Sequence, residues 1–143
     1  MSKTPRVLFL CTRNAARSQM AEALLRRLAG PRFEAASAGL QPTEVHRLTR
    51  QVLDEVGVDT SALRAKGIGE FLGKVKVDYA VIVCERAEDI CPRVYPFTAH
   101  VMHWPFADPQ RIAGSLETRI EAFREVRDAI DSRLRAWLHD VRS

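Results

Sequence analysis

The sequence predicts a single α/β domain, spanning 1–143, with a four-stranded parallel sheet and helices on both faces. Short apolar runs typical of buried strands alternate with stretches in which apolar residues recur at the period of a helix. Such alternation favours a parallel sheet covered on both sides. A length of 143 residues and a hydrophobic content of 46% suit one domain with one core.

Four apolar runs are the predicted strands, at 6–10, 33–38, 77–83 and 99–104. The first run is apolar at every position after Arg6, as expected for a strand buried on both faces. We therefore expect it to lie in the centre of the sheet.

Three longer stretches are the predicted helices. One follows the first strand and ends near Ala29, before a Gly-Pro pair. A second occupies 45–56, with Thr43 as its expected N-cap. The clearest is 116–141, where apolar residues share one face. A short helix is expected near 69–73.

The stretch 11–18 joins the first strand to the first helix. It runs from Cys11 to Arg17 and Ser18, and its interior is Thr12, Arg13, Asn14, Ala15 and Ala16. Free N–H groups and the helix dipole favour an anion at a helix start, and they favour a thiolate at Cys11. The guanidinium of Arg17 can grip two oxygens of a tetrahedral anion. Ser18 could donate a hydrogen bond to the thiolate or be a plain helix residue.

Two other reactive groups follow predicted strands. Cys84 comes after the third strand, and Asp108 comes after the fourth. Because parallel strands end at one edge of a sheet, we expect both to gather with Cys11. Asp108 precedes a proline, and it could protonate an oxygen that leaves the anion or simply belong to a turn.

The composition excludes several classes of function. The net charge of +4 includes no basic run interleaved with aromatic residues, so no nucleic-acid partner is expected. No apolar stretch has membrane-spanning length and the start has no signal-peptide form, so we expect a soluble, cytoplasmic protein without a membrane partner. An odd count of three cysteines favours catalytic or metal use over a disulfide framework.

The stretch 11–18 resembles the anion-binding loop of the low-molecular-weight tyrosine phosphatases. The longer string 11–22 and the segment 83–92 are similar to arsenate reductases built on that fold, in the thioredoxin-coupled branch. The resemblance extends over nearly the whole chain. The loop departs from many relatives at Arg13, where they have Gly, and at Ala15 and Ala16, where they have Ser or Cys.

The resemblance implies a function in arsenic detoxification. Arsenate, with phosphate or sulfate as mimics, would bind the loop and Arg17. Cys11 would attack arsenic while Asp108 protonates the departing oxygen. Cys84 and then Cys91 would resolve the adduct as disulfides, and thioredoxin would reduce the last one. No organic cofactor or metal is implied, and one compact domain suggests a monomer.

The spacing of Cys84 and Cys91 predicts a structural change. In a helix the two Cα atoms would lie roughly 10 Å apart, whereas a disulfide requires them within about 7 Å. The residues between them, 85–90, read as a helical turn or a loop. Our hypothesis is a redox switch that is ordered when reduced and looped out when oxidised.

Other interpretations remain open at this point. A tyrosine phosphatase would use the same Cys11, Arg17 and Asp108, although 110–112 lacks the tyrosines that usually flank its substrate. A sensor of oxyanions or metals would bind without turnover. Cys84 and Cys91 could also be buried structural cysteines, or a zinc pair completed by His100 or His103, although their spacing fits no standard site.

Some relatives bind potassium beside the loop through Asn, Glu, Ser and Asp. Asn14, Glu22 and Ser37 match three of these positions, and Lys66 stands at the Asp position. Its ammonium could replace the ion, so the sequence predicts no dependence on potassium.

Overall fold

The computed structural model describes residues 4–88, 90–96, 98 and 100–141. Strands and helices alternate along the chain, with two short 3-10 helices, η1 and η2. The elements are β1 (Arg6–Cys11), α1 (Arg17–Ala29), β2 (Glu34–Gly39), α2 (Arg47–Asp54), η1 (Ile68–Glu70), β3 (Tyr79–Ile82), β4 (His100–His103), η2 (Pro109–Arg111) and α3 (Leu116–Val141).

The sheet has four strands in the order β2-β1-β3-β4, and all neighbouring pairs are parallel. The predicted four-stranded parallel sheet is therefore confirmed. The strand β1 lies inside the sheet, as its apolar sequence predicted, and Val7 to Leu10 are fully buried. Leu10 pairs with Ala38 on one side and with Ile82 on the other. All four strands thus end at the same edge.

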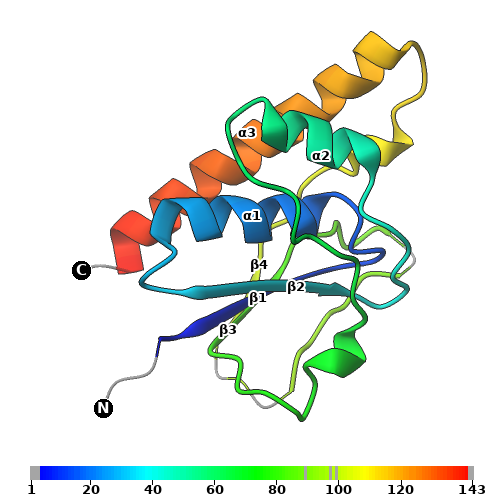
Figure 1. Ribbon diagram of the computed structural model, residues 1–143. Helices are drawn as coiled ribbons and strands as arrows, with labels where there is room; N and C mark the ends of the chain where they lie inside the picture. The colour runs from blue at the N-terminus through cyan, green and yellow to red at the C-terminus, as the bar shows by residue number, and fades with distance from the viewer. Residues whose placement is uncertain (1–3, 89, 97, 99, 142–143) are drawn as a thin grey trace.

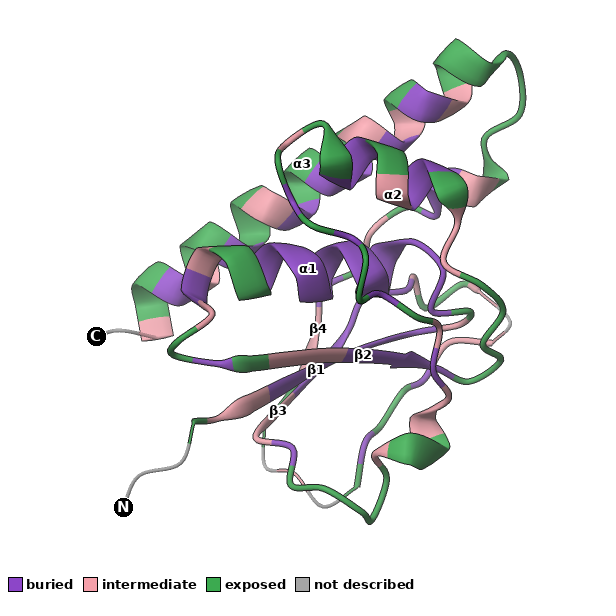
Figure 2. Ribbon diagram, viewed as in Figure 1, coloured by how far each residue is buried: buried purple, intermediate pink, exposed green. Residues whose placement is uncertain are grey.

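The α-helices form a layer on one side of the sheet (Figure 1). The helix α1 packs against β1, β2 and α3, and α2 packs against α3. Figure 2 shows α1 buried along most of its length, whereas α3 exposes its outer side. The chain between α2 and β3, which carries η1, covers the opposite side. Both faces are covered, but the second carries only this short 3-10 helix among the described residues.

The expected element bounds needed several corrections. The helix α2 begins at Arg47, and its N-cap is His46, not Thr43. Thr43 lies too far before the first helical residue to cap it, and its backbone N–H donates to the carbonyl of Arg13 in the loop. The short helix is a 3-10 helix at 68–70 instead of a helix near 69–73. The strand β3 begins at Tyr79 and ends at Ile82, within the expected 77–83.

The last strand differs in detail from the expected 99–104, because β4 ends at His103, whereas the described part of the segment 85–90 agrees with the expected helical turn or loop. The expected fourth strand included Ala99, which lies outside the described residues. The described part of 85–90 forms turns. None of the helices in the described ranges is long and apolar enough to cross a membrane.

Candidate active site

The loop 11–18 is shaped by hydrogen bonds on its outer side. Four of its carbonyl oxygens accept backbone N–H groups of the segment 40–46, at 2.8 to 3.3 Å. They belong to Cys11, Thr12, Arg13 and Ala15. Because these carbonyls point outward, backbone N–H groups are left for the inner side. Within the described part of the chain, the N–H groups of Arg13 and Ala15 have no protein acceptor. This is the arrangement that a cradle for an oxyanion requires.

Gly39, the last residue of β2, lies directly under the loop. A Cβ atom at this position would lie 2.7 Å from the Thr12 carbonyl oxygen and 2.8 Å from the Asn14 nitrogen. Both atoms belong to the backbone, so no side chain could move aside. Only glycine allows the loop to approach the sheet this closely. The sequence showed a glycine after the second strand but gave no sign of what it touches.

Asn14 is the centre of the buried network below the loop. Its φ is 55°, in the left-handed region that asparagine tolerates better than most residues. Its Nδ2 donates to the hydroxyls of Ser18 at 2.8 Å and Ser37 at 2.9 Å. Its Oδ1 accepts from Gln19 Nε2 at 2.9 Å and from the Lys66 backbone at 2.8 Å. Every hydrogen-bonding position of this side chain is thus used to hold the loop in place.

Cys11 is a free, buried cysteine at the start of the loop. Its sulfur lies 2.7 Å from the Ser18 hydroxyl and accepts the Asn14 backbone N–H at 3.2 Å. Because Ser18 Oγ already accepts from Asn14 Nδ2, its hydroxyl hydrogen is available to the sulfur. Two donors are thus directed at this one sulfur.

Arg17 extends its guanidinium into the site from the first turn of α1. It makes two parallel hydrogen bonds to the carboxylate of Glu88, at 2.5 and 2.8 Å. It also donates to the Phe106 carbonyl at 3.1 Å and lies 3.6 Å from Asp108 Oδ2. Burial alone would lower the pKa of Arg17, but Glu88, Asp108 and Cys11 outweigh burial and raise it. The guanidinium therefore stays charged.

The pKa of the Glu88 carboxylate is shifted in the opposite direction, downward. Burial alone would raise the pKa of Glu88, but the hydrogen bonds from Arg17 and from the Glu85 backbone outweigh it and lower the pKa. Sequence reasoning missed this contact. Glu88 and Arg17 are 71 positions apart, and no pattern in the sequence links them.

Asp108 lies where the loop after β4 passes the cradle. Its Oδ1 accepts the Gln110 backbone N–H at 3.0 Å, so the residue caps η2 while Oδ2 faces Arg17. Cys11, Arg17 and Asp108 line one cavity of about 10 Å³, together with Thr12, Arg13, Ala15, Ala16 and Gln110. That volume is room for about one water molecule. The sheet edge thus brings these groups together, but in this state the cavity is too small for a tetrahedral anion.

Cys84 and Cys91 form a disulfide, with Cα atoms 5.9 Å apart. Cys84 is fully buried after β3, the strand beside β1, so it lies near Cys11 at the sheet edge. The Thr12 hydroxyl donates to the Ile90 carbonyl and joins the loop to this segment. Turns in the described part of 85–90 agree with the oxidised half of the switch hypothesis. The other half, that the segment is ordered when the cysteines are reduced, stays a prediction.

The zinc alternative does not fit this arrangement. Both possible cysteine ligands are consumed by the disulfide. The His103 ring lies 2.8 Å from the Cys84 carbonyl through Nε2 and accepts from Arg86 Nε at 3.0 Å through Nδ1. Across the described ranges, no group of three or more His, Cys, Asp or Glu side chains could hold a metal ion.

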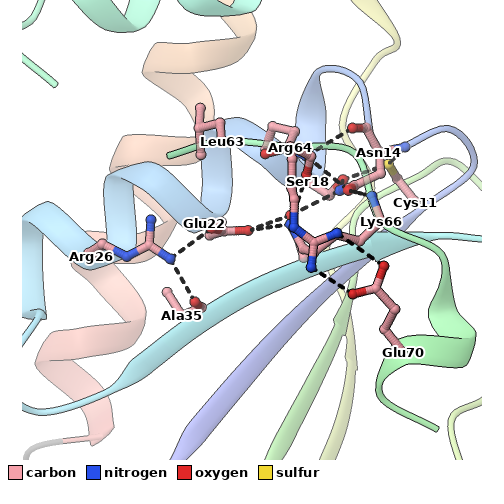
Figure 3. A network of polar contacts seen from close by, with 12 residues as sticks. Cys11, Asn14, Ser18, Glu22, Arg26, Ala35, Leu63, Arg64, Lys66 and Glu70 are labelled. Atoms are coloured by element: carbon pink, nitrogen blue, oxygen red, sulfur yellow. Dashed lines mark hydrogen bonds and ion pairs between the residues drawn. The ribbon is translucent and has the colours of Figure 1, made fainter. Parts of the chain in front are cut away.

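Lys66 lies in the network at the position discussed for potassium (Figure 3). Glu22 Oε1 accepts from the Ser37 hydroxyl at 2.6 Å and lies 3.4 Å from Lys66 Nζ. The ammonium also donates to the Arg64 carbonyl at 2.9 Å. On the other side, Glu22 Oε2 pairs with Arg26 at 2.7 Å. The buried carboxylate is thus neutralised by side chains of the protein.

This fold and this site define a known class of proteins. The model of the family described as low molecular weight phosphotyrosine protein phosphatase matches residues 6–143, and the chain belongs to this family. Within it, the chain is similar to an arsenate reductase of Halalkalibacterium halodurans, with 34% identity over 92% of this chain and 93% of the relative.

Solved structures agree with this placement. An arsenate reductase in the phosphate binding state superposes with a TM-score of 0.78 and 27% identity, over 95% of this chain and 98% of that one. The thioredoxin-dependent arsenate reductase of Corynebacterium glutamicum gives a TM-score of 0.72 and 31% identity. The match covers 99% of this chain but 63% of that protein, which is therefore the longer of the two.

Proposed function

We propose that this protein reduces arsenate to arsenite by a relay of three cysteines and is regenerated by thioredoxin. The observation that best supports the proposal is a Cys84–Cys91 disulfide beside a free Cys11 in an anion-binding loop. A phosphatase needs only the first cysteine. A relay that passes oxidation from one sulfur to the next ends in this state, with the nucleophile restored and the resolving pair oxidised.

The first step is attack on arsenic. Arsenate binds the backbone N–H groups of the loop and the guanidinium of Arg17. The Cys11 thiolate, with Ser18 as its donor, forms a sulfur–arsenic bond. One oxygen of arsenate leaves as water after taking a proton from Asp108, whose carboxyl group lines the same cavity.

The next steps are thiol–disulfide exchanges. The Cys84 thiolate attacks the Cys11 sulfur, and the sulfur–arsenic bond breaks with its electron pair left on arsenic. Arsenic is thereby reduced from As(V) to As(III) and leaves as arsenite. The Cys91 thiolate then attacks Cys84 and displaces Cys11 as a thiolate. In total, arsenate and a dithiol become arsenite, a disulfide and water.

A small dithiol protein must reduce the final disulfide. We propose thioredoxin, in line with the thioredoxin-dependent relative from Corynebacterium glutamicum. Cys91 is half-buried whereas Cys84 is fully buried, so we expect thioredoxin to attack Cys91. The cycle requires a reducing compartment, which suits the cytoplasm. No organic cofactor enters any step, and we propose that the protein acts as a monomer.

The proposal is tested by NADPH oxidation with thioredoxin and thioredoxin reductase, with and without arsenate. The wild-type protein should consume NADPH only when arsenate is present, and phosphate in its place should give no oxidation. Cys91→Ser should fall to the rate without arsenate. Failure of the wild type with thioredoxin, and also with glutaredoxin and glutathione, would contradict the relay.

Hydrolysis of phosphate esters is a second candidate activity. The contacts of Cys11, Arg17 and Asp108 that serve arsenate would also serve a phosphoryl group, and the family model is that of phosphatases. The cleft above the cavity, of about 360 Å³, includes Gln41, Ala87, Ile90 and Arg111 but no aromatic side chain among its described residues. It therefore offers no stacking surface to a phosphotyrosine ring.

We expect this phosphatase activity to be weak. Aryl-phosphate hydrolysis by the reduced enzyme should be unchanged in Cys91→Ser, because hydrolysis does not require a resolving cysteine. Strong hydrolysis in both proteins without arsenate-dependent NADPH oxidation would favour the phosphatase.

A further inference from the structure

The carboxylate of Glu88 occupies the part of Arg17 that an oxyanion would use. Glu88 lies between Cys84 and Cys91, and its two oxygens accept from the two terminal nitrogens of the guanidinium. The side chains of Arg17 and Glu88 are only 5% and 11% exposed. A buried, two-pronged pair of this kind is a strong and directional contact. It imitates the contact that a tetrahedral anion makes with arginine.

The two terminal nitrogens of Arg17 that Glu88 occupies also face two other groups of the protein. One terminal nitrogen also donates to the Phe106 carbonyl, and the other faces Asp108. The cavity beside Cys11 holds about 10 Å³, the space of about one water molecule. An arsenate or phosphate ion that binds these two nitrogens must therefore displace Glu88.

The Cys84–Cys91 disulfide constrains the loop that carries Glu88. It holds the Cα atoms of Cys84 and Cys91 5.9 Å apart, and Glu88 lies near the middle of the seven-residue separation. Within this loop the Glu85 backbone N–H donates to the Glu88 carboxylate at 2.7 Å. A helical arrangement of the same residues would place the two Cα atoms roughly 10 Å apart. Reduction therefore removes the covalent constraint on the position of Glu88.

We propose that Glu88 is an internal ligand of the anion site whose binding is controlled by the Cys84–Cys91 redox state. While the disulfide is present, the Glu88 carboxylate binds Arg17 and excludes arsenate and phosphate. When a dithiol protein reduces the pair, it supplies two electrons and two protons and becomes a disulfide itself. Glu88 then leaves Arg17 and the site opens. This inference rests on the anion-binding role of the loop in the proposed function.

Such a gate prevents a reaction that would trap the enzyme. Cys11 is a free cysteine while Cys84 and Cys91 are oxidised. If arsenate entered then, Cys11 would form the sulfur–arsenic adduct with no thiolate at Cys84 to resolve it. A carboxylate tethered beside Arg17 has an effective concentration on the order of millimolar. Free anion with a similar affinity for Arg17 is therefore outcompeted below that concentration until the enzyme has been reduced.

The test is isothermal titration with inorganic phosphate in both redox states. The oxidised state is prepared with one free thiol per chain, as in the structure. The variants are Glu88→Gln, which removes the charge and keeps the size, and the matched control Glu85→Gln in the same segment. Phosphate binding requires neither thioredoxin nor turnover, so the readout is independent of the reductase reaction.

Oxidised wild-type protein should bind phosphate at least about tenfold more weakly than reduced wild-type protein. Glu88→Gln should remove most of this difference by strengthening binding to the oxidised state alone, whereas Glu85→Gln should behave as wild type. Equal binding by both redox states of the wild type, or no effect of Glu88→Gln on the oxidised state, would overturn the gate. Absence of binding to the reduced wild type would contradict the anion site itself, and with it the gate.

Discussion

The loop 11–18 and the segment 84–91 meet at the same site, but they are held in different ways. The loop is fixed by backbone hydrogen bonds on its outer side and by the buried side chain of Asn14 beneath it. The segment is tied to the loop by the Arg17–Glu88 pair and by the Thr12 hydroxyl, and its own shape depends on a disulfide.

These two ways of holding a region suit two tasks, which are anion binding by the loop and a redox-dependent change of shape in the segment. A cradle must present its N–H groups in one geometry, and buried, fully satisfied hydrogen bonds provide that rigidity. A redox segment must adopt two geometries, so its contacts have to be removable. A covalent bond that thiols can exchange and an ion pair that an anion can replace meet this need. Substitutions in each region distinguish the rigid one from the removable one.

The largest effect is expected at Gly39. In Gly39→Ala, the new Cβ would lie 2.7 Å from the Thr12 carbonyl oxygen and would force the loop away from β2. A shift of about 1 Å can cost about 100-fold in rate, so we expect a loss of that order in arsenate reduction, together with weaker phosphate binding. Gly69→Ala is the matched control, because a Cβ there would contact nothing within 4 Å. Equal effects of the two substitutions would contradict the close packing of the loop.

The next effect is on stability, when side-chain hydrogen bonds of the two regions are removed separately. Asn14→Ala removes the four bonds of a buried side chain and leaves a non-glycine residue at positive φ. It should lower the free energy of unfolding by about 2–4 kcal/mol. Thr12→Ala removes the one bond to Ile90 and should cost about 0.5–1.5 kcal/mol. Urea unfolding measures both, and the reverse order would show that the segment, not the loop, is the rigid part.

The pH dependence of stability tests the outer support of the loop. His46 donates its backbone N–H to the Ala15 carbonyl, and its Nδ1 accepts the Leu48 N–H as the cap of α2. Burial, with Arg119 and Arg47 nearby, lowers the pKa of His46 below its usual 6.5. The unfolded chain therefore binds the proton more readily, so stability is complete above pH 6.5 and falls as the pH drops below it.

The expected loss is about 1 kcal/mol, the usual worth of an N-cap. Urea unfolding between pH 5 and 8 measures it, and these bounds are about the range in which histidine titrates. In His46→Asn, which keeps a capping side chain, this part of the pH dependence should disappear. A wild-type stability that rises on acidification through this range would contradict the assignment.

The smallest effect is expected from potassium. Glu22 already has Lys66 and Arg26 as partners, so an added cation has no unpaired carboxylate to bind. Replacing sodium by potassium at constant ionic strength should change neither turnover nor melting temperature. A rise in either with potassium would show that Lys66 does not take the place of the ion.

Much of this architecture could be predicted because it depends on local patterns. The apolar run before Cys11 gave a central strand, and parallel strands ending at one edge placed Arg17 and Asp108 around one cavity with Cys11. The long apolar face of 116–141 gave α3 with its bounds.

The missed features depend on contacts between distant parts of the chain. Thr43 has the chemistry of an N-cap, but the Arg13 carbonyl takes its N–H, and the helix starts later with His46. The clash that keeps Gly39 a glycine involves a loop far from it in sequence. Nothing near Glu88 indicates that it pairs with Arg17, because only the folded chain brings the two together.

The most direct test of the relay is a single turnover without any electron donor. Reduced protein is mixed with one equivalent of arsenate, quenched with an alkylating agent and mapped by mass spectrometry. The relay predicts one arsenite per chain, a Cys84–Cys91 disulfide and an alkylated Cys11, whereas Cys91→Ser should stop at a Cys11–Cys84 disulfide. Arsenite release without either disulfide, or a fully reduced protein after mixing, would contradict the three-cysteine relay.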